Sequence, residues 1–75
     1  MVVLDVKATG EHIGDMRRQK GITVRELQAM LGFTTPNAIY KWQAGKNLPT
    51  IDNMVTLAAI FGCSVDDMLI VRTDR

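Results

Sequence analysis

The side chains best suited to chemistry lie between Thr34 and Ile51, where amide, hydroxyl, aromatic and basic groups recur and no acidic residue occurs. Asn37, Tyr40 and Lys41 fall close together within this stretch. An amide can bond an adenine edge at two positions, and a lysine can reach a guanine or a phosphate. These groups therefore have the chemistry of a surface that contacts nucleic acid. The chain offers no pair of catalytic acids and no nucleophile with an adjacent base, so it is not expected to be an enzyme.

A helix over residues 36–44 would position these groups. Thr35 is a good N-cap residue, and Pro36 fits the first helical position, where its missing N–H costs nothing. Ile39 and Trp42 lie about one turn apart and should face the core. That orientation leaves an outward set, which is Asn37, Ala38, Tyr40, Lys41 and, in part, Gln43.

Caps, periodicity and breakers predict four further helices, at about residues 10–20, 24–31, 51–61 and 65–70. Thr9 should precede the first helix, and Thr23 with Glu26 should form a capping box at the second. Thr50 and Ser64 should cap the last two. Two apolar stripes should face the core, and they comprise Val24, Leu27, Met30 and Leu31 in one helix and Ile51, Met54, Leu57, Ala58 and Phe61 in the other. The pattern predicts an all-α domain of five short helices.

A chain of 75 residues fits one domain. Residues 9–71 should form it, between an N-terminal arm over residues 1–8 and a tail over residues 72–75. The arm is β-branched and alternates weakly, which fits either a short strand or an extended segment. The net charge is only +1, but the basic excess lies in the first two-thirds of the chain and the acidic excess in the last third. Such a distribution suits a protein that presents one face to a polyanion.

The single cysteine, Cys63, excludes an intrachain disulfide framework, and a lone histidine, His12, leaves no metal-ligand set. We therefore expect no metal and no cofactor. The N-terminal stretch lacks the pattern of a signal peptide, and no apolar run approaches the roughly 20 residues of a membrane span. A cytoplasmic location without a membrane partner is the expectation.

Two segments of the chain, "RRQKGITVRELQAMLGF" and "AIYKWQAGKNLPTIDNMVTLAAIFGCSVDDML", resemble the phage-repressor and Cro-type helix-turn-helix family, also called XRE-like. The resemblance runs from about Ile13 to Leu69. It implies a compact, lambda-repressor-like five-helix domain that binds double-stranded DNA and places its third helix in the major groove. Such domains usually bind as two-fold dimers on half-sites about one DNA turn apart.

The resemblance and the outward face together give a candidate DNA-binding set. Its members are Thr35, Asn37, Ala38, Tyr40 and Lys41 in the third helix, Lys46 and Asn47 just after it, and Arg25 at the start of the second. Three features depart from the family pattern. Val24 stands where a glutamine usually braces a phosphate contact, so that role is not carried over. The turn "FTTP" is one residue longer than usual and should re-aim the third helix. Gln43 stands where an acid usually pairs with Arg17, and we expect Arg17 to reach its amide oxygen instead.

Several apolar side chains exceed what so small a domain can bury, which suggests a homodimer. The candidates for its interface are Val55, Ala59, Ile60, Ile70 and Val71. The most favoured function is a sequence-specific, repressor-like transcriptional regulator. One alternative is an antitoxin-like regulator that also binds a cognate protein. Another is a protein-interaction module that has lost DNA binding, which the low net charge and Val24 favour and the acid-free third helix opposes.

Overall fold

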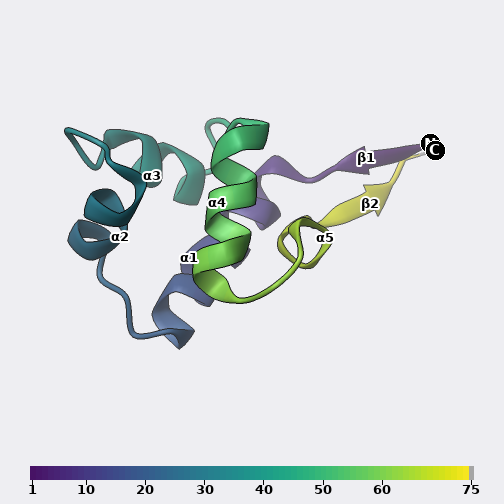
Figure 1. The fold of residues 1–75 in the computed structure, drawn as a ribbon. Helices are drawn as coiled ribbons and strands as arrows, with labels where there is room; N and C mark the ends of the chain where they lie inside the picture. Colours follow the sequence, from purple (N-terminus) through teal and green to yellow (C-terminus); the bar gives the residue numbers. More distant parts are fainter. Residues whose placement is uncertain (75) are drawn as a thin grey trace.

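The computed structural model describes residues 1–74 of the chain. Its elements in chain order are β1 (Val2–Leu4), α1 (Val6–Gln19), α2 (Val24–Leu31), α3 (Asn37–Gln43), α4 (Ile51–Phe61), α5 (Val65–Met68) and β2 (Val71–Thr73). The helices pack into one body, and the two strands form a narrow ribbon that leaves this body at one end (Figure 1). The prediction of a five-helix domain is confirmed, with a minor two-stranded sheet added to it.

Every helix contributes one fully buried apolar side chain to a single core, and these are Ile13, Leu27, Ile39, Leu57 and Met68. Trp42 and Phe61, each 3% exposed, and Met54 and Ala58 complete the core. Complete burial of such a side chain contributes roughly 1.5–3 kcal/mol. The core therefore ties all five helices together, and no helix is held by local contacts alone.

Two residues of the predicted apolar stripes lie at the surface instead. Met30 is 53% exposed and Ile51 is 75% exposed. Met30 is the penultimate residue of α2, and Ile51 is the first residue of α4. A residue at a helix end can keep the apolar period and still lie beyond the neighbouring helices, so periodicity misplaced both side chains.

The predicted capping box of α2 is present. The N–H of Glu26 donates to Thr23 Oγ1 at 3.0 Å, and the N–H of Thr23 donates to Glu26 Oε1 at 3.0 Å. Ser64 and Asp67 form the same reciprocal pair at α5. These hydrogen bonds satisfy N–H groups that the first turn of each helix would otherwise leave without partners.

The first helix begins earlier than predicted, at Val6. Asp5 caps it, because its Oδ1 accepts the N–H of Ala8 at 2.9 Å. Thr9, expected as the cap, is fully buried inside the helix. Its hydroxyl accepts the N–H of Ile70 at 3.0 Å and donates to the Ile70 carbonyl at 3.3 Å. Thr9 therefore fastens the end of the chain to α1, a tertiary role that cap statistics do not reveal.

The fifth helix ends earlier than predicted, at Met68. Leu69 already has an extended backbone, with φ −86° and ψ 130°. The Ile70 carbonyl accepts the N–H of Asp5 at 2.8 Å, and Val71 then enters β2. Pairing with β1 replaces the last helical turn that periodicity suggested.

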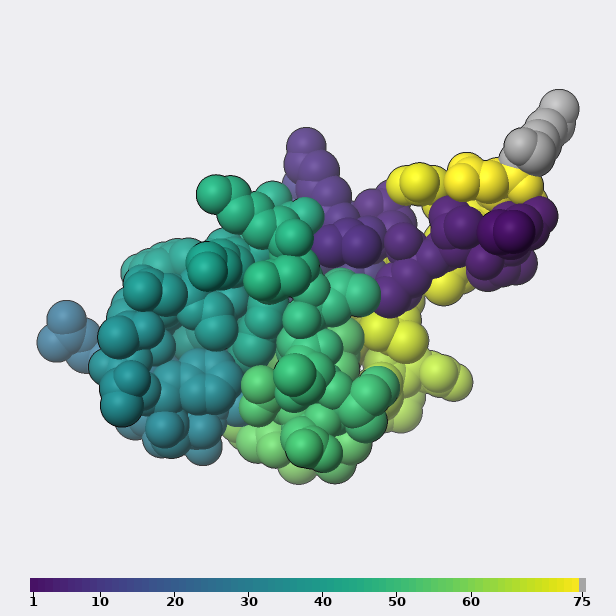
Figure 2. Space-filling model, turned by 90° about the horizontal axis from the view of Figure 1, so that it is seen from above, coloured from purple at the N-terminus to yellow at the C-terminus, as the bar shows by residue number. Residues whose placement is uncertain are grey.

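β1 and β2 pair as antiparallel neighbours, with Val2 opposite Thr73, Val3 opposite Arg72, and Leu4 opposite Val71. The ribbon projects from the body in both views of the whole molecule (Figures 1 and 2). None of the helices in the described part of the chain has the length and apolar character needed to span a bilayer.

Candidate nucleic-acid interface

The turn between α2 and α3 runs from Gly32 to Pro36. Gly32 ends α2 in the left-handed conformation, with φ 71°. The N–H of Phe33 donates to the Gln28 carbonyl at 3.0 Å, and the Gln28 side-chain amide donates to the Phe33 carbonyl at 3.3 Å. The first half of the long turn is therefore held to α2 by both backbone and side chain.

α3 begins at Asn37, one residue later than predicted. Pro36 occupies the cap position, with φ −85° and ψ 5°, and its carbonyl accepts the first helical N–H, that of Tyr40, at 3.2 Å. Thr35 Oγ1 accepts the N–H of Asn37 at 3.4 Å, a long bond that lies outside the helix. The proline starts the helix, as expected from its fixed φ. Pro36 thus takes the cap position that was predicted for Thr35, and no side-chain hydrogen bond caps the helix.

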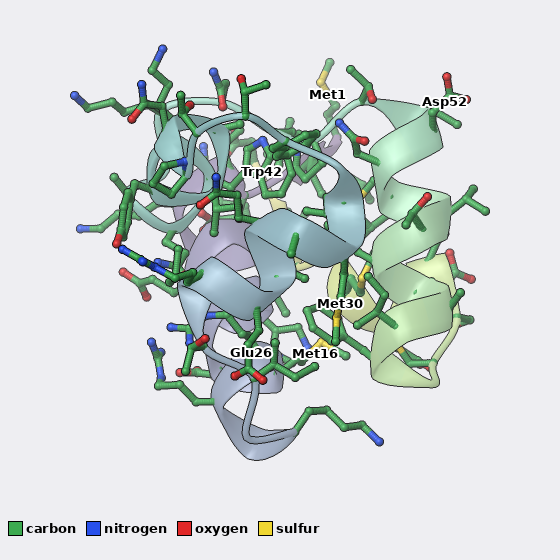
Figure 3. The ribbon with its side chains drawn as sticks, turned by 60° about the vertical axis from the view of Figure 1, so that its left-hand side comes forward. Met1, Met16, Glu26, Met30, Trp42 and Asp52 are labelled. Atoms are coloured by element: carbon green, nitrogen blue, oxygen red, sulfur yellow. The ribbon has the colours of Figure 1, made fainter. Side chains whose placement is uncertain are left out.

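The inner face of α3 carries Ile39 and Trp42, as predicted, and both are buried. The Phe33 ring meets the Trp42 ring edge-on, with centroids 5.9 Å apart and planes at 67°. Figure 3 shows Trp42 within the helical body, whereas Glu26 and Asp52 lie at its margin. Aromatic contacts of this geometry add to burial, so the turn and α3 are fixed to one another.

α1 supports α3 from behind through close backbone packing. A Cβ added at Gly10 would lie only 1.7 Å from the Trp42 carbonyl oxygen. Gly45 follows α3 and has a φ of 74°. A Cβ added at Gly45 would lie only 2.7 Å from Lys7 Cα. Glycine at these two positions allows the backbones to approach. Gly10 was not predicted as a contact residue, although the spacing of Gly10 and Gly14, one helical turn apart on α1, could have indicated a close helix crossing.

Arg17 joins α1 to the end of α3. Its Nε donates to Gln43 Oε1 at 3.1 Å, and its Nη1 donates to the Ile22 carbonyl at 2.8 Å. The expected hydrogen bond between a charged guanidinium and a neutral amide is thus present, at a half-buried position. Hydrogen bonds to a charged group contribute about 1.5–3 kcal/mol. Arg17 therefore anchors the far end of α3 and the loop before α2.

The outward face of α3 presents Asn37, Tyr40 and Lys41 to solvent. Tyr40 is 53% exposed, which is high for an aromatic side chain in a small domain. Ala38 is only half exposed and packs against the core, so it points outward less than expected. The remaining candidates flank this face and are all exposed, namely Thr35, Lys46, Asn47 and Arg25.

An open groove of about 510 Å³ runs between α2 and α3. It is lined by Val24, Arg25, Gln28, Ala29, Phe33, Pro36 and Tyr40. Arg25 and Tyr40 thus belong to one concave surface, although they lie on different helices. Gln28 was missed by the sequence analysis, because nothing in its local pattern distinguishes a turn-holding glutamine from a solvated one.

The outward face of α3 and the exposed residues that flank it carry a basic charge. Lys41, Lys46 and Arg25 are exposed, and no acid occurs between Thr34 and Ile51. Glu26 is the acid nearest to Arg25 in the chain, and its carboxylate is engaged in the capping box. The N–H and hydroxyl of Thr23 lower the pKa of Glu26 below its ordinary value of 4.5. The surface therefore offers cations and amide donors suited to an anionic ligand.

His12 and Cys63 do not line this groove, and both lie near Asp67. His12 Nε2 is 2.8 Å from the Asp67 carbonyl oxygen. Cys63 is half-buried, and burial followed by the charge of Asp67 raises the pKa of its thiol. Within residues 1–74, histidine, cysteine and acidic side chains do not gather in a group of three that could hold a metal ion.

Comparison with solved structures shows the fold. The clp gene regulator ClgR from Corynebacterium glutamicum matches with a TM-score of 0.76 and 24% identity, covering 88% of this chain and 69% of that one. The restriction-modification controller protein C.AhdI from Aeromonas hydrophila matches with a TM-score of 0.75 and 17% identity, covering 85% of this chain and 96% of that one. The BldD DNA-binding domain from S. venezulae matches with a TM-score of 0.73 and 18% identity, covering 88% of this chain and 97% of that one. No curated protein sequence matches the chain.

A helix-turn-helix family model matches residues 13–68, which is most of the chain. The matched region contains α2, the turn and α3, together with the core residues that hold them. The fold, the exposed basic face of α3 and this match agree with one another. The chain therefore belongs to the phage-repressor and Cro-type, or XRE-like, helix-turn-helix family of DNA-binding regulators.

Proposed function

We propose that this protein is a sequence-specific, repressor-like transcriptional regulator that inserts α3 into the major groove of double-stranded DNA. The observation that carries the proposal is the face of α3, where Asn37, Tyr40 and Lys41 are exposed opposite a buried Ile39 and Trp42. A helix of seven residues is about 10 Å long. With its side chains a helix is about 10–12 Å across, so α3 fits a major groove about 12 Å wide, and its short length lets it reach only a few base pairs.

The proposed roles follow from the position of each side chain. Asn37 stands in the first turn of α3, where recognition helices contact base edges, and its amide suits adenine. Tyr40 lies one turn on and offers a ring to a thymine methyl. Lys41, Lys46 and Arg25 carry the positive charge that phosphates require. Ala38 contributes at most its partly exposed methyl group. Thr35 and Asn47 flank the helix and supply polar contacts to the backbone.

The mechanism is occupancy of an operator, which blocks or recruits the polymerase. Selection of bound duplexes from a random pool tests the proposal. We expect an enriched palindromic motif, and binding that weakens steeply with salt because phosphate contacts release counterions. Retention on duplex DNA without any enriched sequence would contradict specific reading. No retention even at low salt would favour the alternative of a module that has lost DNA binding.

An antitoxin-like role remains a second candidate because α4 carries an exposed apolar stripe. Ile51 and Val55 are 75% and 58% exposed, and Ala59 continues the same face. Such a stripe suits contact with another protein. Co-expression with the product of a neighbouring reading frame, followed by co-purification, tests this role. A cognate partner should be released by Val55→Glu, and no co-purification would count against the role.

We also propose that the regulator acts as a homodimer. The expected interface residues lie on two separate surfaces. Val55 and Ala59 belong to the α4 stripe, whereas Val71 lies in the ribbon, next to Ile70. Ile60 is half-buried and packs on the core, so it is the weakest candidate. The two surfaces would give two different dimers.

A further inference from the structure

The ribbon has a hydrogen-bond pattern that leaves two residues of β1 with unpaired backbone groups at its outer edge. Met1 and Asp74 exchange both bonds, with N···O distances of 2.9 and 2.8 Å. Hydrogen-bonded and non-hydrogen-bonded pairs alternate along an antiparallel ladder. Val3 opposite Arg72 is therefore the next bonded pair. Val2 and Leu4 lie between bonded pairs, so their N–H and C=O groups point away from β2.

These outward groups match a second copy of the same strand. If two β1 strands meet antiparallel about a two-fold axis at Val3, Val2 of each copy stands opposite Leu4 of the other. Each such pair can exchange two hydrogen bonds, so the contact satisfies every outward group of Val2 and Leu4. We infer that two copies of the chain join through the outer edges of β1, forming a four-stranded antiparallel sheet at the centre of the dimer.

Two observations favour a strand partner at this edge. A two-stranded ribbon is marginal in water, and three or more strands give independent stability. The ribbon also exposes apolar side chains, since Met1, Val2 and Val71 are 86%, 67% and 58% exposed. Pairing of two ribbons removes part of this apolar surface from water and supplies the missing strands.

The opposite edge of the ribbon does not suit the same contact. Two β2 strands paired about their centre would bring Arg72 of each copy directly opposite the other, and like charges at that position are destabilising. Arg72 already lies 3.6 Å from the Asp5 carboxylate and 3.4 Å from that of Asp74 in its own chain. The charge of β2 therefore selects the β1 edge and limits growth of the sheet beyond four strands.

The contact is small, so the free dimer should be weak. Only three residues of each β1 take part. The area that they bury is therefore far below the roughly 1,000 Å² expected of a stable interface. DNA can supply the missing affinity, because two half-sites on one duplex raise the effective concentration of the second copy. The inference rests on the proposed function for this purpose, but pairing of the ribbons can be measured without DNA.

The pairing also predicts the shape of the operator. α2 and the turn lie farthest from the ribbon, whereas the end of α3 packs against the start of α1, where Gly45 closely approaches Lys7 (Figure 1). Antiparallel pairing turns one copy end for end, so the two bodies extend in opposite directions from the shared sheet. One copy is 40 Å long. The two α3 helices should therefore lie on opposite sides of the shared sheet and reach separate half-sites of one duplex.

A matched pair of proline substitutions tests the β1 edge. Val2→Pro removes an outward N–H from β1, and Thr73→Pro removes an outward N–H from β2. Neither takes a donor from the ladder between the two strands, so both variants should keep the wild-type melting temperature. Val55→Glu serves as a third variant that disrupts the α4 stripe. Sedimentation equilibrium from about 10 μM to about 1 mM protein then gives the association constant of each.

We expect wild type, Thr73→Pro and Val55→Glu to associate equally, and Val2→Pro to associate at least about tenfold more weakly, since two of four hydrogen bonds are lost. Unchanged association of Val2→Pro would overturn the inference, as would a monomeric wild type at every concentration. Loss of association in Val55→Glu alone would assign the dimer to α4 instead.

Binding to DNA separates this inference from the proposed function. Val2→Pro should bind a single half-site as wild type does and lose cooperativity on a two-half-site duplex. If the wild type failed to bind any half-site, the DNA-binding function would be refuted, while the sedimentation result would still decide how two copies associate.

Discussion

Gly10 and Gly14 form a matched pair of positions for testing how closely α1 supports α3. A Cβ at Gly10 would lie 1.7 Å from the carbonyl oxygen of Trp42 and 2.8 Å from its carbonyl carbon. A Cβ at Gly14 would lie 3.3 Å from the ends of two flexible side chains, those of Arg18 and Gln43. Backbone must move in the first case, whereas only side-chain tips must move in the second. Replacing each glycine by alanine should therefore change stability in opposite directions.

The expected magnitudes follow from two opposing effects. Inside a helix, alanine is favoured over glycine by about 1 kcal/mol. Gly14→Ala should keep part of this gain, because Gln43 Oε1 must shift slightly while it accepts the Arg17 hydrogen bond, and should raise the free energy of unfolding by less than about 1 kcal/mol. At Gly10 the backbone of α3 must retreat by about 1.5 Å or more to reach a normal carbon–oxygen contact. Overpacking of this kind costs about 1–3 kcal/mol or more, so Gly10→Ala should be net destabilising.

The displacement has a second effect, because the Trp42 carbonyl that would be pushed away accepts the N–H of Gly45 at 3.0 Å. The end of α3 should loosen as well as move. A loss of 1 kcal/mol lowers the melting temperature of a domain this size by about 4–8 °C. Gly10→Ala should also lose affinity for a selected half-site more than for random duplex, since the aim of α3 changes.

Thermal and urea unfolding of the two alanine variants beside wild type provides the assay. A lower melting temperature for Gly10→Ala with an equal or higher one for Gly14→Ala is the expected result. If both variants shifted in the same direction, or if Gly10→Ala unfolded like wild type, the close packing of α1 on α3 would be refuted.

Three further predictions follow from the contacts of α2 and α3. Gln43→Glu should raise the melting temperature by a few degrees through an ion pair with Arg17, and an equal gain in an Arg17→Met background would contradict the pair. Asn37→Ala should lower affinity for the selected site by about 5–150-fold, corresponding to roughly 1–3 kcal/mol. Lys41→Ala should instead lower affinity for all duplexes alike. A uniform loss of affinity with Asn37→Ala would mean that Asn37 reads no base. Because the pKa of Glu26 is lowered in the folded state, its carboxylate stabilises the fold above pH 4.5, and this contribution is lost as the pH falls through the folded pKa. The difference in free energy of unfolding between wild type and Glu26→Gln should therefore shrink below pH 4.5 in acid titrations.

The elements whose causes are local could be predicted from the sequence. The Thr23 and Glu26 capping box needs only four neighbouring residues, and it is present as predicted. Ile39 and Trp42 were placed correctly because they lie about one turn apart on the face of α3 that packs against α1 and the core. The acceptor of Arg17 was also identified, because the family pattern brings that position close to Gln43.

The features that the sequence did not reveal depend on partners distant in the chain. Thr9 resembles a cap by type, and only the bond to Ile70, 61 residues away, shows its tertiary role. The strands escaped firm prediction because each has three residues and gains its structure from the other. Gln28 and Gly10 act through the turn and through a backbone contact, and neither leaves a local pattern of charge or periodicity.

The pairing of Met1 with Asp74 brings the two described ends of the chain within one hydrogen bond, at the end of the body remote from α2. In topological terms the backbone is nearly a closed circle. A short linker between these ends, with a new opening in the exposed loop at Lys46 and Asn47, should give a circular permutant that keeps the same core. It also means that a reporter fused at either end emerges from the same place, far from the groove between α2 and α3.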